Sequence, residues 1–146
     1  MISLFKNENA WLSNFAPAKV TFDGMEYPSV EHAYQAAKTL DYGQRLMIAR
    51  TPLAVVAKKM GKSVTMRSDW LQVRVAIMQD LLKQKFAIPM YHDLLLSTKD
   101  EELVEGNWWH DTFWGCFTCY SHKGSGANWL GRLLMGIRSD LGKSTF

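Results

Sequence analysis

Residues 27–38 read Tyr-Pro-Ser-Val-Glu-His-Ala-Tyr-Gln-Ala-Ala-Lys, and this run predicts a helix with a sharp start. Ser29 is the expected N-cap, because its hydroxyl can accept a hydrogen bond from a free N–H of the first turn. The apolar residues of the run recur at i, i+3, i+4 and i+7, so they form one stripe that should face the core. These residues are Val30, Ala33, Tyr34 and Ala37.

A polar stripe follows the same spacing on this helix. Glu31, Gln35 and Lys38 should lie on the border between core and solvent. An acid, an amide and an amine aligned in this way can form the wall of a cleft. They can equally be a solvated stripe with a weak Glu/Lys interaction, and periodicity does not separate the two interpretations.

Composition indicates one globular domain spanning 1–146, with a core at about 5–140 and a frayed tail at 142–146. The net charge of +3 permits contact with a phosphate-bearing ligand but is too small to indicate nucleic-acid binding by itself. No apolar run approaches the roughly 18 residues that span a bilayer, and the start of the chain lacks signal-peptide features. We therefore expect a cytoplasmic protein that does not enter membranes, with reduced cysteines.

The remaining pattern is mostly helical. A hairpin is expected at 19–27 around an Asp23-Gly24 turn. Helices are expected at 29–40, 44–50, 51–61, 70–86, 91–97 and 127–141, with one short strand at 103–105. Within the third helix, Pro52 should take the first position, and the buried stripe should be Leu53, Val56, Ala57 and Met60. The expected fold class is a predominantly helical α+β single compact domain with a small β hairpin.

Four possible metal ligands cluster late in the chain. They are His110, Cys116, Cys119 and His122. The Cys-x-x-Cys spacing resembles a zinc knuckle, but the segment has only one cysteine pair, and both histidines lie close to it. We therefore expect no metal and no cofactor.

Two loops have side chains suited to nucleotides. Asp111 and Trp114-Gly115 can bind a ribose hydroxyl and stack on a base, although a turn cap and a core plug explain them equally well. Glycines 124 and 126 lead into the last helix, where free N–H groups and Asn128 can hold an anion. A plain turn is the alternative there.

Taken in order, the motifs form a specific series. It consists of Leu12-Ser-Asn-Phe15, Pro28-Ser-Val-Glu-His-Ala-Tyr-Gln-Ala-Ala-Lys38, Ala57…Gly61, Arg67…Trp70, Lys85-Phe86, Leu95-Leu-Ser-Thr98, Leu103-Val-Glu105, Asp111…Phe-Trp-Gly115, and Asn128…Leu130-Gly131…Leu134-Met135…Ile137-Arg138. This series resembles the NADAR domain family, also called the YbiA-like family, over roughly residues 5–140.

The resemblance implies a mainly helical α+β fold whose members split N-glycosidic bonds. One branch hydrolyses phosphoribosylamino intermediates of riboflavin biosynthesis, and another removes ADP-ribose from guanine bases of nucleic acid. The riboflavin branch has an Asp-Gly segment after Trp-Gly, where this chain has Cys116-Phe117. This departure favours the ADP-ribose branch, so the expected partner is an ADP-ribose-containing substrate on nucleic acid.

The resemblance also assigns site residues. Glu31 matches the family's acid and Lys38 its lysine, and both are expected to be catalytic, with Glu31 stabilising an oxocarbenium ion or Lys38 forming a Schiff base. Substrate binding is expected from Ser13, Asn14, Phe15, Gln35, Arg67, Asp111, Trp114, Gly115 and Asn128.

The expected activity is an N-glycosidase that removes ADP-ribose from guanine in DNA or RNA. Three alternatives stay open: a glycosidase for phosphoribosylamino-pyrimidines, a non-catalytic ADP-ribose or NAD-binding module, and a zinc-stabilised interaction domain. The oligomeric state is left open.

Overall fold

The computed structural model describes residues 1–107, 111–117 and 126–143. Its contacts divide the chain into two compact units. One unit is Asn14–Ile88, and the other combines Met1–Ser13 with Pro89–Phe146. Helices dominate, accompanied by a small antiparallel hairpin, so the predicted α+β class is confirmed.

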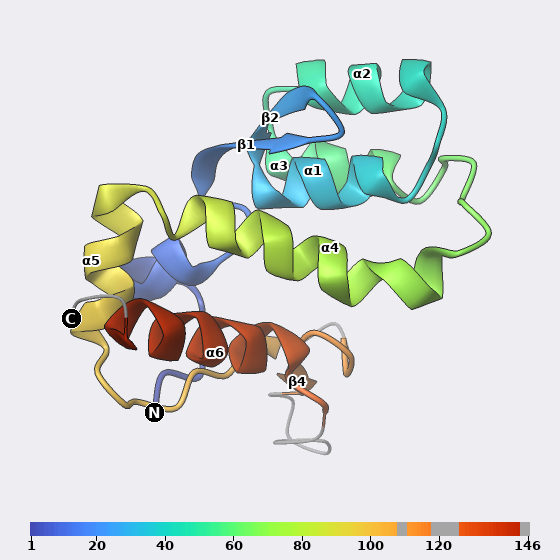
Figure 1. Cartoon of the computed structure of the whole chain (residues 1–146). Helices are drawn as coiled ribbons and strands as arrows, with labels where there is room; N and C mark the ends of the chain where they lie inside the picture. The colour runs from blue at the N-terminus through green and yellow to red at the C-terminus, as the bar shows by residue number, and fades with distance from the viewer. Residues whose placement is uncertain (108–110, 118–125, 144–146) are drawn as a thin grey trace. The chain divides into compact units, whose positions relative to one another are not determined.

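The first unit opens with the predicted hairpin, which joins β1 (Pro17–Phe22) to β2 (Met25–Ser29) (Figure 1). Asp23 and Gly24 form its two-residue turn with φ of 47° and 80°. Both values are positive, as a tight turn between right-handedly twisted strands requires, and Asp and Gly are residues that tolerate them.

The helix α1 (Val30–Ala37) follows β2 directly. The Ser29 hydroxyl accepts a hydrogen bond from the His32 N–H at 3.1 Å, so the predicted N-cap is confirmed. The helix ends earlier than expected, with Lys38 as its C-cap, and Thr39 then forms an isolated bridge with Met66.

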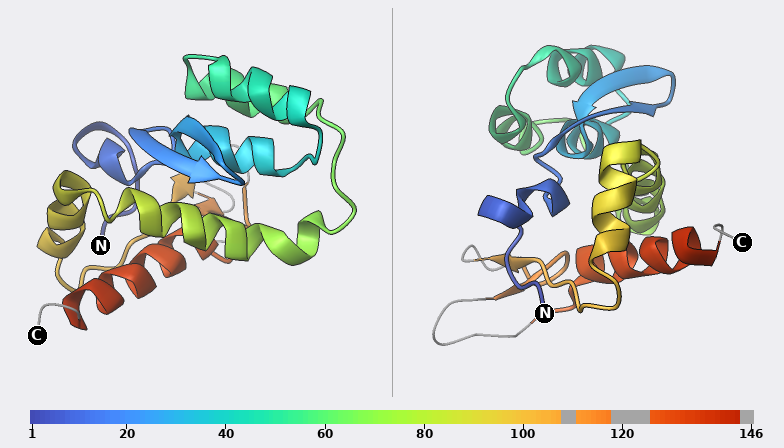
Figure 2. Two further views of the ribbon diagram at one scale, coloured as in Figure 1. Left: turned by 45° about the horizontal axis from the view of Figure 1, so that its top comes forward. Right: turned by 90° about the vertical axis from the view of Figure 1, so that its left-hand side faces the viewer.

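Every residue of α1 is buried, which corrects the expected position of its polar stripe. Both strands of the hairpin and three helices contact α1: α2 (Tyr42–Arg50), α3 (Ala54–Met60) and α4 (Trp70–Lys85). The strands and α1 lie side by side in both views of Figure 2. A helix covered on several sides has no solvent border, so Glu31 and Gln35 are buried.

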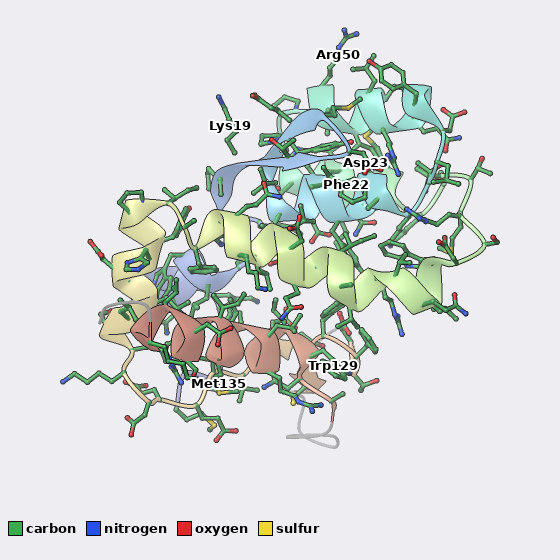
Figure 3. The ribbon with its side chains drawn as sticks, viewed as in Figure 1. Lys19, Phe22, Asp23, Arg50, Trp129 and Met135 are labelled. Carbon is green, nitrogen blue, oxygen red and sulfur yellow. The ribbon has the colours of Figure 1, made fainter. Side chains whose placement is uncertain are left out.

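Arg45 of α2 ties this helix to the closed end of the hairpin. Its Nη1 donates to Asp23 Oδ2 at 2.8 Å, and its guanidinium lies 5.0 Å from the centre of the Phe22 ring. Figure 3 labels both hairpin residues beside the helices of this unit. The Arg45 Nε also donates to the carbonyl oxygen of Thr39 at 2.8 Å, so the buried guanidinium is paired in two directions.

The predicted start and buried face of α3 are wrong. Leu53 is its N-cap and makes no side-chain capping bond, so Pro52 lies outside the helix. Leu53 is 59% exposed and Val56 is 37% exposed, and of the expected stripe only Ala57 is buried. A seven-residue helix buries little surface, and α3 contacts α1 while its large residues Val55 and Val56 stay exposed.

The longest helix of this unit matches its prediction. α4 begins at Trp70 and ends at Lys85, and it contacts α1 and β1. The Trp70 ring lies 5.1 Å, centre to centre, from the ring of Tyr34 on α1.

The second unit holds a 3₁₀ helix η1 (Asn7–Leu12), α5 (Pro89–Ser97), β3 (Gly106–Asn107), β4 (Cys116–Phe117) and α6 (Trp129–Lys143). β3 and β4 pair in parallel, whereas the strand expected at 103–105 is reduced to a bridge between Leu103 and Ile2. Trp129, labelled in Figure 3, opens α6, which packs against α5. In the described ranges, no helix combines the length and the apolar character that crossing a bilayer requires.

Candidate active site

Glu31 lies in the first turn of α1 and is 7% exposed. Its Oε1 accepts a hydrogen bond from Gln35 Nε2 at 2.8 Å, and its backbone N–H donates to the carbonyl oxygen of Asn14 at 3.1 Å. The positive end of the helix dipole favours a negative charge here. The structure therefore holds a buried carboxylate in a fixed orientation.

Gln35 is in turn confined by Gly61. A Cβ at position 61 would overlap the Gln35 side-chain amide. The Gln35 Oε1 is buried and has no hydrogen-bond donor among the described residues. The close approach of Gly61 thus confines the Gln35 amide, whose Nε2 donates the hydrogen bond to Glu31.

Lys38 is the C-cap of α1 and is partly buried. Its Nζ lies 5.8 Å from the centre of the Tyr34 ring. Desolvation lowers the pKa of the Lys38 ammonium below its ordinary value, the Glu31 carboxylate opposes this shift, and Lys58 and Lys62 lower the pKa further. A larger fraction of Lys38 is therefore neutral at a given pH than for a solvated lysine.

Asn14 and Phe15 immediately precede the hairpin. Asn14 is 9% exposed, and its Nδ2 donates to Met78 Sδ at 3.5 Å. Its Oδ1 is a buried acceptor with no donor in the described part of the chain. Phe15 is exposed, and the Lys58 Nζ lies 5.8 Å from the centre of its ring.

Arg67 joins this region through its backbone, since its N–H donates to the carbonyl oxygen of Lys38 at 2.7 Å. Its guanidinium makes two hydrogen bonds to Asp69, at 2.6 and 3.1 Å. This pairing raises the pKa of Arg67 and lowers that of Asp69. The expected role of Arg67 in substrate binding stays a prediction.

The other expected binding residues belong to the second unit. Ser13 ends η1, and its N–H donates to the carbonyl oxygen of Ala10 at 3.0 Å. Asp111 Oδ1 accepts from the N–H groups of Phe113 and Trp114 at 3.0 and 2.9 Å, which is a turn cap. The Trp114 ring meets the Phe113 ring edge-on at 4.8 Å between centres.

Gly115 and Asn128 have clear structural partners. A Cβ at Gly115 would overlap the carbonyl oxygen of Glu105. Asn128, with φ of 51°, accepts from the Glu105 N–H at 3.0 Å and donates to the Leu103 carbonyl oxygen at 2.9 Å. These bonds hold residues 103–105 against the start of α6, and the expected phosphate contact of Asn128 stays a prediction.

Of the possible metal ligands, the structure describes Cys116. Burial raises the pKa of its thiol, and its Sγ lies 3.7 Å from the carbonyl oxygen of Gly126. His110, Cys119 and His122 lie outside the described residues. Within the described ranges, no group of three or more His, Cys, Asp or Glu side chains is placed to bind a metal ion.

The sequence interpretation missed two neighbours of the site: Gly61, which lies against Gln35, and Lys62, which lowers the pKa of Lys38. The i, i+4 spacing of Lys58 and Lys62 was the available signal, because it places two cations on one side of α3 and of the turn that follows. The contact of Gly61 with Gln35 has no such signal, since it joins two separate helices.

Several known proteins are similar to this chain in sequence or in structure. The model of the NADAR domain family matches residues 4–142. The N-glycosidase YbiA of Escherichia coli is 37% identical over 132 residues, which cover 88% of this chain and 79% of that protein. The NMR structure of Escherichia coli YbiA superimposes with a TM-score of 0.81 and 32% identity, and covers 99% of this chain and 89% of that one.

Two longer relatives contain a similar region. A riboflavin biosynthesis protein of Vibrio vulnificus is 36% identical over 137 residues, which cover 91% of this chain and 36% of that protein. A chloroplastic riboflavin biosynthesis protein of Zea mays is 32% identical over 161 residues, which cover 97% of this chain and 25% of that protein. This chain thus spans about a third and a quarter of their lengths. Together with the match over residues 4–142, these similarities show that the chain belongs to the NADAR domain family.

Proposed function

We propose that the protein is an N-glycosidase that removes ADP-ribose from guanine bases of DNA or RNA. The observation that carries this proposal is the buried Glu31 carboxylate, held by Gln35 on the same helix as the partly desolvated amine of Lys38. The relative named N-glycosidase YbiA supports the general reaction.

Glu31 suits the chemistry of glycosidic cleavage. Breaking the bond between ribose C1′ and a base nitrogen builds positive charge on the sugar, and a fixed carboxylate stabilises that charge without reorganisation. The Gln35 hydrogen bond keeps one carboxylate oxygen in place. The same carboxylate can accept a proton from the attacking water or amine.

Lys38 offers a covalent route. Its neutral amine attacks C1′, the C1′–N bond breaks, and the guanine nitrogen leaves with the bonding electron pair and takes up a proton. Ring opening gives a Schiff base between Lys38 and the ribose, and water then releases ADP-ribose and restores the amine. The lowered pKa of Lys38 favours the neutral form that this attack requires.

Substrate binding completes the proposal. Asn14 Oδ1, a buried acceptor without a donor in the described structure, suits a ribose hydroxyl. The exposed Phe15 ring suits stacking on a base. Trp114 stays a separate candidate for base stacking. We retain Ser13, Arg67, Asp111, Gly115 and Asn128 as binding candidates with no further role assigned.

A second candidate is an N-glycosidase for phosphoribosylamino-pyrimidines. The names of the relatives from Vibrio vulnificus and Zea mays favour it. The Cys116-Phe117 segment, which forms β4, argues against it, because the family resemblance implies an Asp-Gly segment at this point in the riboflavin branch.

A substrate panel separates these candidates. The full chain is incubated with an oligonucleotide that contains ADP-ribosylated guanine and, separately, with a phosphoribosylamino-pyrimidine. Release of ADP-ribose from the oligonucleotide supports the proposal, and turnover of the pyrimidine alone supports the second candidate. Tight ADP-ribose binding by calorimetry without turnover of either compound would instead indicate a binding module.

Borohydride reduction tests the covalent route. It should trap an adduct between the wild-type chain and the opened ribose, and Lys38→Arg should abolish that adduct. Turnover by the wild type without any trapped adduct would favour direct attack by water.

A further inference from the structure

The end of α3 and the turn after it carry a run of lysines beside α1. Gly61 lies against Gln35, which places this turn next to the part of α1 that holds Glu31 and Lys38. Lys58 and Lys62 are four residues apart, and Lys62 directly follows Gly61. The Lys58 ammonium reaches over the exposed Phe15 ring at 5.8 Å from its centre.

Two further positive charges act on Lys38 in this region. The charges of Lys58 and Lys62 lower the pKa of Lys38, and the Glu31 carboxylate raises it. Like charges in this proximity repel one another, and a bound anion would relieve the repulsion. A group with two negative charges would meet the positive charges of Lys58 and Lys62.

We propose that Lys58 and Lys62 bind the pyrophosphate of the ADP-ribose group whose ribose C1′ reacts between Glu31 and Lys38. The pyrophosphate carries two negative charges and is joined through one carbon to the ribose ring, so it must lie close to the reacting sugar. This inference rests on the proposed function. It adds Lys58 and Lys62, which belong to the same compact unit as Glu31 and Lys38, as the residues that hold the phosphates.

A structural explanation exists for part of the lysine run. Cations in the last turn of a helix stabilise its negative end, and Lys58 and Lys59 both satisfy this rule. The rule does not cover Lys62, which lies beyond the helix. Lys59 is exposed and carries the same charge, whereas Lys58 and Lys62 are the cations with the largest effects on the pKa of Lys38. Lys59 therefore provides a matched control.

The test is calorimetric titration of the full chain with free ADP-ribose and, separately, with an unmodified oligonucleotide. Lys58→Gln and Lys62→Gln should each weaken ADP-ribose binding about ten-fold, because each removes a charge-assisted contact to a phosphate oxygen. Lys59→Gln, which changes the net charge equally, should bind ADP-ribose like the wild type. Circular dichroism checks that all three variants are folded.

Three results would overturn the inference. They are a wild type that does not bind ADP-ribose, equal weakening by Lys59→Gln, and loss of oligonucleotide binding with ADP-ribose binding unchanged. The last result would assign the lysines to a nucleic-acid backbone. The titration requires no turnover, so it tests the lysines separately from the reaction. A chain that binds ADP-ribose through Lys58 and Lys62 but releases none from guanine would contradict the proposed function and leave the binding site intact.

Discussion

Lys38 takes its reactivity from its neighbours. Desolvation lowers the pKa of its ammonium, Glu31 opposes this shift, and the two cations Lys58 and Lys62 add to it. Each neighbour can therefore be tested by its effect on one observable, the pH at which the Lys38 amine becomes nucleophilic.

Lys62→Gln should raise the pKa of Lys38 towards its ordinary value, because it removes a nearby positive charge. Borohydride trapping measured against pH should then show a midpoint at higher pH than for the wild type. Lys59→Gln should leave the midpoint unchanged. An unchanged or lower midpoint in Lys62→Gln would contradict the electrostatic account of Lys38.

Individual residues of the site differ in how far sequence predicts them. Helical spacing correctly placed Glu31 and Gln35 on one face, and the hydrogen bond between them follows from that spacing. Burial of both residues was not predictable, because it depends on elements distant in the chain. The same applies to Asn128, whose amide bonds to residues 103 and 105 rather than to its own helix.

At the scale of elements, α1 and α3 fit together through Gly61. Gly61→Ala should destabilise the fold by about 1–3 kcal/mol and lower glycosidase activity, because a Cβ there overlaps the Gln35 amide that orients Glu31. Gly136→Ala in α6 is the control. Beyond the backbone of its own helix and its chain neighbours, no atom of the described residues lies within 4 Å of a Cβ at Gly136, so that change should stabilise the chain by roughly 0.5–1 kcal/mol.

Urea unfolding of the two variants measures these free energies, and the glycosidase assay measures the activities. If Gly61→Ala and Gly136→Ala are equally stable and equally active, the contact of Gly61 with Gln35 contributes neither to stability nor to activity.

The start of α1 should make stability depend on pH through His32. Its Nε2 lies 2.8 Å from the Thr51 carbonyl oxygen, which can only accept, so Nε2 carries the proton. Its Nδ1 then accepts from the Ser29 hydroxyl at 2.7 Å, and the ring is neutral. Desolvation lowers the pKa of His32, so the unfolded chain binds a proton more readily than the folded chain.

The free energy of unfolding should therefore fall as pH drops below about 6.5, the ordinary pKa of histidine, and should be fully present above it. Urea denaturation between pH 5 and pH 8 measures this dependence. His32→Gln should show a weaker dependence over the same range. An identical slope in the wild type and the variant would exclude His32 as its source.

Local signals explain which elements the sequence predicted. The hairpin has an Asp-Gly turn, α1 has a serine cap, and α4 has a long periodic pattern, and all three form where expected. The predicted buried face of α3 was wrong: Leu53 and Val56 are exposed, Ala57 is buried, and Gly61 after the helix lies against Gln35. Periodicity identifies the face of a helix that carries large apolar residues, so it does not predict the buried face of a helix that packs through small residues.

At the scale of the molecule, the family match spans both compact units, from residue 4 to residue 142. Glu31 and Lys38 belong to one unit, and Asp111 and Trp114 belong to the other. The sequence identified the family because motifs from both units occur in a fixed order along the chain. It did not reveal the division into units, because that depends on which segments contact one another.

The glycosidase reaction with Glu31→Gln tests the central claim most directly. The full chain is mixed in excess with an oligonucleotide carrying ADP-ribosylated guanine, and released ADP-ribose is measured over a single turnover. The wild type should release ADP-ribose and restore the guanine, and Glu31→Gln should be slower by about 100-fold or more because it loses the charge that stabilises the transition state. No release by the wild type, or release by Glu31→Gln at the wild-type rate, would contradict the account.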